Sequence, residues 1–172
     1  KTADGKNKFT SLIRNEMPQE TYLQLADWYW SLGLLKESLE VLSLSPAHPE
    51  VYYWMANLKH QLGEKDAIDF IDKANSLSPH LVFPFRSRSA EVLTWVVGKS
   101  PNWKPKYYLG LVYWSKNNLE VAKELFIKCG SPDFAPFYAV KAELMKEDNV
   151  INWQKASKLD PTEWRYGKLL IN

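Results

Sequence analysis

One stretch, residues 104–130, limits the fold of this chain more than any other, because its apolar residues recur at spacings of three and four. Residues that far apart share one face of a helix. We predict one helix over 104–116 and a second over 119–128. Between them lies Asn117-Asn118, which suits a tight turn because Asn tolerates positive φ. The stretch is therefore predicted to be two helices folded back on each other.

The two predicted helices complement each other in side-chain size. Gly110 on the first helix and Ala122 on the second are small, so they let the two backbones approach. Tyr113 and Phe126 are large and lie at helical spacing from them, so they fill the space beside the close approach. This arrangement of large and small residues predicts a tightly packed helical hairpin.

The spacing of this hairpin resembles that of the tetratricopeptide repeat, in which W-x2-L-G-x2-Y is followed by A-x3-F and a small residue. Five of the seven positions agree in type and all agree in spacing. Lys106 replaces the Trp, and Cys129 replaces the last small residue. The resemblance implies an all-α chain that forms an α-solenoid of antiparallel helix pairs, wound as a right-handed superhelix. The matching residues are Leu109, Gly110, Tyr113, Ala122 and Phe126.

The same spacing recurs along most of the chain. Pro18 and Pro49 open two further first helices, because proline fits the first helical turn, and Gly33 and Gly63 close them. Only one good helix is found over 81–103, where a repeat needs two. We predict about nine or ten helices and no sheet. The predicted organisation is a linker or short helical lead-in over 1–17 and a repeat domain over 18–172, with units at about 18–48, 49–80, 81–103 (irregular), 104–131, 132–160 and 161–172 (partial).

Composition narrows the possible partners. The formal net charge is only +2 over 172 residues, so binding to nucleic acid or to an acidic membrane surface has no electrostatic support. The chain contains no run of about eighteen apolar residues that would span a bilayer. A single Cys excludes an internal disulfide. We therefore expect neither a nucleic-acid partner nor a membrane partner.

Residue types that carry catalysis or bind metals are sparse and scattered. His48, His60 and His80 have no His, Cys or carboxylate partner at the spacing of metal ligands. Cys129 lies at a packing position, so we interpret it as a buried structural thiol and not a nucleophile. No Gly-rich phosphate loop or Ser-His-Asp order appears. We expect no catalytic residue, no metal and no cofactor, and the chain is predicted not to be an enzyme.

Aromatic residues are the most informative group for function. The chain has 8 Trp, 9 Tyr and 7 Phe, and they cluster on first helices, as in 28–30 and 52–54. Successive helical residues point about 100° apart, so three adjacent aromatics do not all face one core. One interpretation is packing between neighbouring repeats. The other is an aromatic-lined groove that holds a peptide or a sugar.

A specific groove follows from the family resemblance, because the first helices of tetratricopeptide repeats line a concave surface. Positions five, nine and twelve of each first helix are expected to face it. The nine residues that we predict to form the binding groove are Leu23, Asp27, Trp30, Tyr53, Asn57, His60, Tyr107, Leu111 and Trp114.

Three functions stay open on the sequence. The first is a non-catalytic scaffold that binds a protein or peptide, or other domains of its own chain. The second is an auxiliary repeat domain of a larger carbohydrate-active bacterial protein, packing on its catalytic domain or contacting sugar. The phrases VFPFR, NWKPKYYLGLVYW and CGSPDFAPFY resemble the C-terminal repeat region of large bacterial proteins whose N-terminal part is carbohydrate-related. The third is a structural spacer.

The ends of the chain suggest a longer protein. It starts at Lys1 and not at Met, so we expect it to be a fragment. The last stretch, 161–172, carries the strongly apolar residues Trp164, Leu169, Leu170 and Ile171, which favours continuation of the repeats beyond it over a capping helix.

Overall fold

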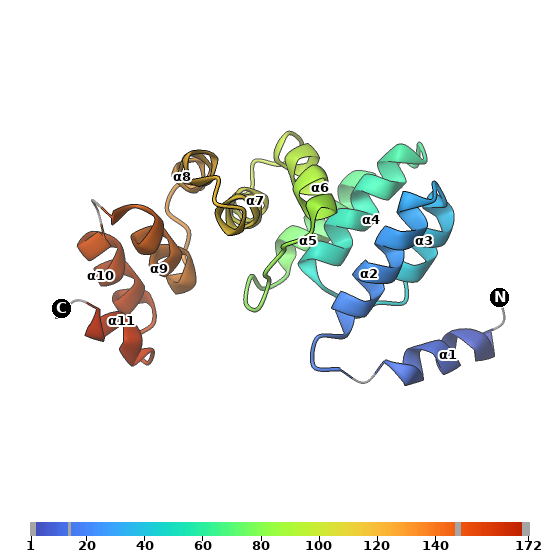
Figure 1. Cartoon of the computed structure of the whole chain (residues 1–172), viewed down its shortest axis with the longest axis horizontal. Helices are drawn as coiled ribbons and strands as arrows, with labels where there is room; N and C mark the ends of the chain where they lie inside the picture. Colours follow the sequence, from blue (N-terminus) through green and yellow to red (C-terminus); the bar gives the residue numbers. More distant parts are fainter. Residues whose placement is uncertain (1–2, 14, 147–148, 170–172) are drawn as a thin grey trace. The chain divides into compact units, whose positions relative to one another are not determined.

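The computed structural model describes residues 3–13, 15–146 and 149–169, and these residues form eleven helices and no strand (Figure 1). The prediction of an all-α chain is confirmed, with slightly more helices than the nine or ten expected. Residues 170–172, the end of the predicted partial unit, lie outside the described part. The helices are α1 (Ala3–Leu12), α2 (Pro18–Ser31), α3 (Leu35–Leu42), α4 (Pro49–Gln61), α5 (Ala67–Ser76), α6 (Ser87–Val97), α7 (Trp103–Ser115), α8 (Leu119–Lys128), α9 (Ala135–Leu144), α10 (Asn149–Leu159) and α11 (Trp164–Lys168).

Most helices pack in hairpins with their neighbour in the sequence. The pairs are α2 with α3, α4 with α5, α7 with α8, and α9 with α10. Gly33 and Gly63 turn the first two hairpins with φ of 77° and 74°, where glycine carries no steric penalty. Asn117 turns the third with φ of 58°, as its sequence position predicts.

The chain divides into two compact units. The first contains residues 1–82 and 86–100, and the second contains 83–85 and 101–172. Within the first unit, α6 packs on α4, while α4 also packs on α3 and α5. Helix α6 is thus an edge element of the first unit, attached chiefly through one neighbour.

The second unit is built around a cluster of aromatic rings. The Phe126 and Phe137 rings stack with centroids 5.4 Å apart, and Tyr107 lies 5.6 Å from Phe126 and 5.8 Å from Phe137. A Cβ at Gly110 would lie 2.7 Å from the Phe126 ring, so only glycine fits there. The predicted close approach of α7 and α8 is therefore present. The cluster joins α7, α8 and the first turn of α9.

Candidate functional site

The nine predicted groove residues fall into two groups by exposure. Four of them reach the surface: Asp27, Leu111 and Trp114 are half-buried, and His60 is exposed. A buried side chain does not touch a ligand in this conformation, so contact with a ligand falls to these four. The buried five are Leu23, Trp30, Tyr53, Asn57 and Tyr107.

The two buried tyrosines have internal partners. Tyr53 donates its hydroxyl to Asn75 Oδ1 at 2.8 Å, and the Asn75 amide donates to Ser100 Oγ at 3.2 Å. Tyr107 lies inside the aromatic cluster of the second unit, where burial raises the pKa of its phenol far above the ordinary value. Tyr53 thus bonds within its own predicted unit, 49–80, whereas Tyr107 contacts both Phe126 of its own hairpin and Phe137 of the next.

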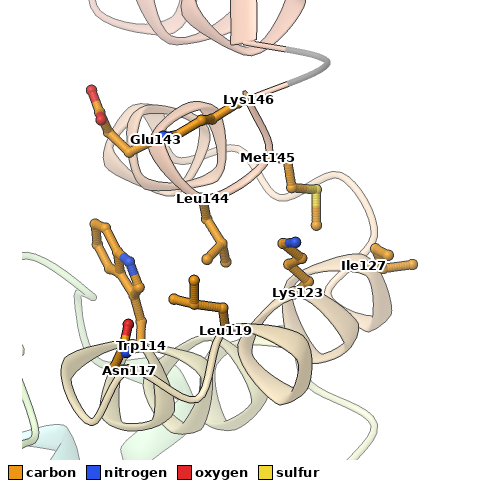
Figure 2. Close-up of a pocket in the computed structure, with 9 residues that line it drawn as sticks. All are labelled: Trp114, Asn117, Leu119, Lys123, Ile127, Glu143, Leu144, Met145 and Lys146. Atoms are coloured by element: carbon orange, nitrogen blue, oxygen red, sulfur yellow. The ribbon is translucent and has the colours of Figure 1, made fainter.

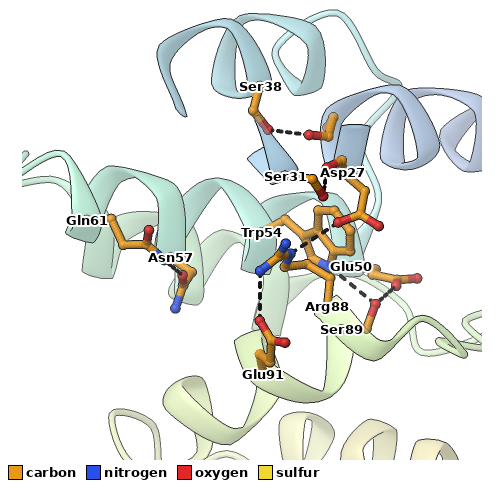
Figure 3. Close-up of polar contacts among 11 residues, drawn as sticks. Asp27, Ser31, Ser38, Glu50, Trp54, Asn57, Gln61, Arg88, Ser89 and Glu91 are labelled. Carbon is orange, nitrogen blue, oxygen red and sulfur yellow. Dashed lines mark hydrogen bonds and ion pairs between the residues drawn. The ribbon is translucent and has the colours of Figure 1, made fainter. Parts of the chain in front are cut away.

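The first candidate surface lies on α2, α4 and α6 and is centred on Arg88 (Figure 3). Arg88 Nε lies 3.1 Å from Asp27 Oδ1, and its Nη1 lies 2.8 Å from Glu91 Oε2. The guanidinium carbon sits 4.9 Å from the centre of the Trp30 ring, a cation–π distance. Arg88 therefore covers Trp30 and joins α6 to α2. Sequence reasoning missed it, because residues 81–103 were interpreted as an irregular segment.

His60 and Asn57 lie farther along α4 on this first unit. The His60 imidazole stacks on the Trp95 indole of α6, with centroids 4.9 Å apart and planes 26° apart. Asn57 Oδ1 accepts a hydrogen bond from Gln61 Nε2 at 2.7 Å (Figure 3). Two predicted groove residues, Asp27 and His60, thus each contact α6. We call Asp27, His60, Arg88 and Trp95 the polar face.

The second candidate surface is a cleft of about 780 Å³ in the second unit (Figure 2). It opens between α8 and the last turn of α9, whereas the aromatic cluster closes the same seam near the first turn of α9. Leu119 and Leu144 point toward each other across it, and Trp114 lies beside them (Figure 2). We call it the α8–α9 cleft. The residues that line it are Trp114, Asn117, Leu119, Lys123, Ile127, Glu143, Leu144, Met145 and Lys146.

The α8–α9 cleft combines an apolar interior with charges at its edge. Ile127 is 62% exposed and Leu119 is 39% exposed, so apolar area is available to a partner. Lys123 forms an ion pair with Glu120 at 3.1 Å on the same helix. Such a cleft can take apolar side chains of a partner while polar groups at its edge orient the backbone. Of the nine predicted groove residues, Trp114 is the one that lines it.

The single thiol has the structural character that its position predicts. Cys129 is buried, and burial raises its pKa to about 12. Its Sγ lies 3.2 Å from the carbonyl oxygen of Leu125, one turn earlier. A thiol that stays protonated is a poor nucleophile and a poor metal ligand.

Metal-ligand clusters and membrane-spanning helices are both absent from the described residues. In 3–13, 15–146 and 149–169, no group of three or more His, Cys, Asp or Glu side chains is placed to hold a metal ion. None of the helices in this same part of the chain is long and apolar enough to cross a bilayer.

Comparison with known proteins gives structural likenesses alone. No protein-family model matches the chain, and no curated protein matches it significantly. Among solved structures, TTC0263, a thermophilic TPR protein of Thermus thermophilus, is 18% identical over 90% of this chain and 100% of that chain, with a TM-score of 0.43. The MamA protein is 24% identical over 86% of this chain and 76% of that chain, with a TM-score of 0.33. At these scores neither likeness adds to what the helices themselves show.

Proposed function

We propose that the protein is a non-catalytic helical-repeat scaffold that binds a protein or peptide partner, with the α8–α9 cleft as its principal contact. The observation that carries the proposal is the cleft itself. Apolar side chains of α8 and α9 face an open space of about 780 Å³, and an indole stands at its edge. Trp is among the residue types that dominate binding energy at protein interfaces.

The size and chemistry of the cleft favour a transient interaction. A partner that inserts two apolar side chains gains roughly 3–6 kcal/mol from their burial. Association also costs translational and rotational freedom, on the order of several kcal/mol. The remaining affinity depends on contacts outside the cleft. A peptide that binds in an apolar groove commonly presents such side chains from one face of a helix.

The polar face is proposed as a second, weaker contact. Asp27 and His60 are the predicted groove residues that keep exposed polar atoms there, while Arg88 is held by Asp27 and Glu91. Exposed charges contribute more to association rate and orientation than to affinity. This face would therefore select among partners rather than supply most of the binding energy.

A comparison of two tryptophan variants tests the proposal. Peptides selected from a random library on the wild-type chain are titrated by calorimetry against Trp114→Ala. We expect the affinity to fall by roughly ten- to hundredfold, because an anchor at an interface is lost. The matched control is Trp28→Ala, since Trp28 is 58% exposed on α2 and lies outside the cleft. Failure to select any peptide, or equal losses in the two variants, would contradict the proposal.

The carbohydrate alternative is tested with the same variants on a glycan array. Glycan binding that Trp114→Ala abolishes would favour sugar as the ligand of the cleft, because an indole face also stacks on sugar rings. Absence of glycan binding together with a peptide complex would leave the protein or peptide partner.

A further inference from the structure

The first unit contains a carboxyl group in an unusual environment. Glu50 lies in the first turn of α4 and is only 3% exposed. Its Oε1 accepts a hydrogen bond of 2.5 Å from the hydroxyl of Ser89 on α6. That hydroxyl in turn accepts from the Trp54 indole N–H at 3.3 Å (Figure 3). This chain of hydrogen bonds crosses the contact between α4 and α6, and all three of its side chains are buried.

Charged groups from two neighbouring elements face Glu50. Glu20 on α2 pairs with Arg86, which precedes α6, at 2.6 Å. His48 precedes α4 and faces Glu20, and burial lowers the pKa of its imidazole. Arg86 acts on the pKa of Glu50 in the opposite direction to Glu20, and its ion pair is with Glu20. Among the residues that the structure describes, Glu50 therefore has no cation of its own.

Burial decides the charge state of Glu50. It raises the pKa of the carboxyl from an ordinary 4.5 to about 7, with a smaller contribution from Glu20, while the Ser89 hydroxyl and Arg86 act to lower it. The amino end of α4 also favours a carboxylate. Because Ser89 of α6 contacts Glu50 directly, release of α6 would return this carboxyl to water. The proton and the docked helix therefore stabilise each other.

We propose that the docking of α6 on α4 is a proton-linked switch, in which neutral Glu50 holds α6 in place and ionised Glu50 releases it. Helix α6 is the element that yields, since it is attached chiefly to α4, whereas α4 is also held by α3 and α5. Release would carry Arg88 and Trp95 away from α2 and α4. The polar face would thus be populated more fully at low pH than at high pH.

The direction and size of the effect follow from linkage. A carboxyl whose pKa is raised in the docked state contributes stability that is fully present below pH 4.5 and is lost as pH rises through about 7. Released α6 returns Glu50 to an ordinary pKa. The equilibrium constant for release should therefore rise by roughly tenfold to thirtyfold between about pH 5.5 and about pH 8.5.

Hydrogen exchange of the intact chain measures this release directly. Amide protection of 87–97 is followed by mass spectrometry at both pH values, corrected for the intrinsic pH dependence of exchange, with α5 as an internal reference. In the wild type we expect protection of α6 to fall by at least about tenfold relative to α5. Glu50→Gln carries a neutral side chain at every pH, so its α6 should stay protected at both.

Three further variants keep the test decisive. Ser89→Ala removes the hydroxyl that favours the carboxylate, so the loss of protection should move to higher pH, and this result stands even where Glu50→Gln fails to fold. Glu91→Gln removes an exposed carboxylate of α6 and should leave the midpoint unchanged. His48→Asn should retain the full pH dependence. A pH-independent wild type, an unaltered profile in Glu50→Gln, or loss of the dependence in His48→Asn would each overturn the proposal. Peptide binding at the α8–α9 cleft does not enter this measurement, so the two proposals fail separately.

Discussion

Trp30 and Trp114 occupy the same position in two helical hairpins but lie in different surroundings. Each stands three residues before the turn residue, Gly33 in the first hairpin and Asn117 in the other. Trp30 is 8% exposed, and its ring meets that of Trp54 at 5.8 Å and 88°. Trp114 is half-buried at the edge of the α8–α9 cleft. One repeat position thus serves as core in one unit and as surface in the other.

The difference lies in the helix that follows each hairpin. Trp54 of α4 covers Trp30 in the first unit, with ring centroids 5.8 Å apart. In the second unit the α9 side chain that lies beside Trp114 is Leu144, across an open cleft (Figure 2). The side chains of the next repeat, and not those of the repeat itself, therefore decide whether the tryptophan at this position is available to a ligand.

The largest expected effect concerns the buried tyrosines and would break the distinction between core and surface. Tyr53→Ala and Tyr107→Ala should each lower the free energy of unfolding by roughly 3–5 kcal/mol, as Phe126→Ala does, because all three side chains are buried and leave cavities. Thermal melts of the three variants check this. If the tyrosine variants melt near the wild type, these residues belong to a groove after all.

A smaller effect separates the two tryptophans. Trp30→Ala should destabilise the first unit by roughly 3 kcal/mol, since a ring packed on both sides is lost. Trp114→Ala should cost about 1 kcal/mol, because solvent already replaces part of its packing. Urea unfolding of both variants gives the two values. Equal losses would mean that the α8–α9 cleft is closed in solution.

The smallest expected change in stability comes from filling the space beside Trp114, so that its surroundings resemble those of Trp30. Leu119→Trp enlarges a side chain that lines the cleft and is already 39% exposed, so the free energy of unfolding should change by no more than about 1 kcal/mol. Binding of a selected peptide should fall by roughly tenfold or more, as measured by calorimetry. A control, Leu119→Met, conserves the volume and should bind as the wild type does. Undiminished binding by Leu119→Trp would place the ligand elsewhere.

Sequence reasoning succeeded where contacts are local. The hairpin of α7 and α8 depends on Gly110 meeting Phe126 and on the turn at Asn117, and all three lie within one short stretch whose spacing is diagnostic. Sequence reasoning predicted the one helix within 81–103, which is α6, but not its attachment through Ser89 and Arg88 to residues far back in the chain. No local spacing reveals such partners.

The candidate site shows the same limit. Trp114 was predicted from its register, but its cleft partners Leu144 and Met145 come from the next repeat and were missed. Glu50 was missed too, because an acidic residue in the first turn of a helix is ordinarily a solvated one that favours the helix dipole. Its burial and its hydrogen bond from Ser89 of α6 make it unusual.

The sequence by itself determined the helices, their turns and their pairing, since helical periodicity, glycine at positive φ and large–small complementarity all act between residues close in the chain. The tertiary structure decided which aromatic side chains are buried in the core, where the cleft opens and which carboxyl group is buried. Those properties depend on which side chains of successive repeats meet, such as Trp54 on Trp30 and Leu144 beside Trp114, and not on the pattern in which the residues recur.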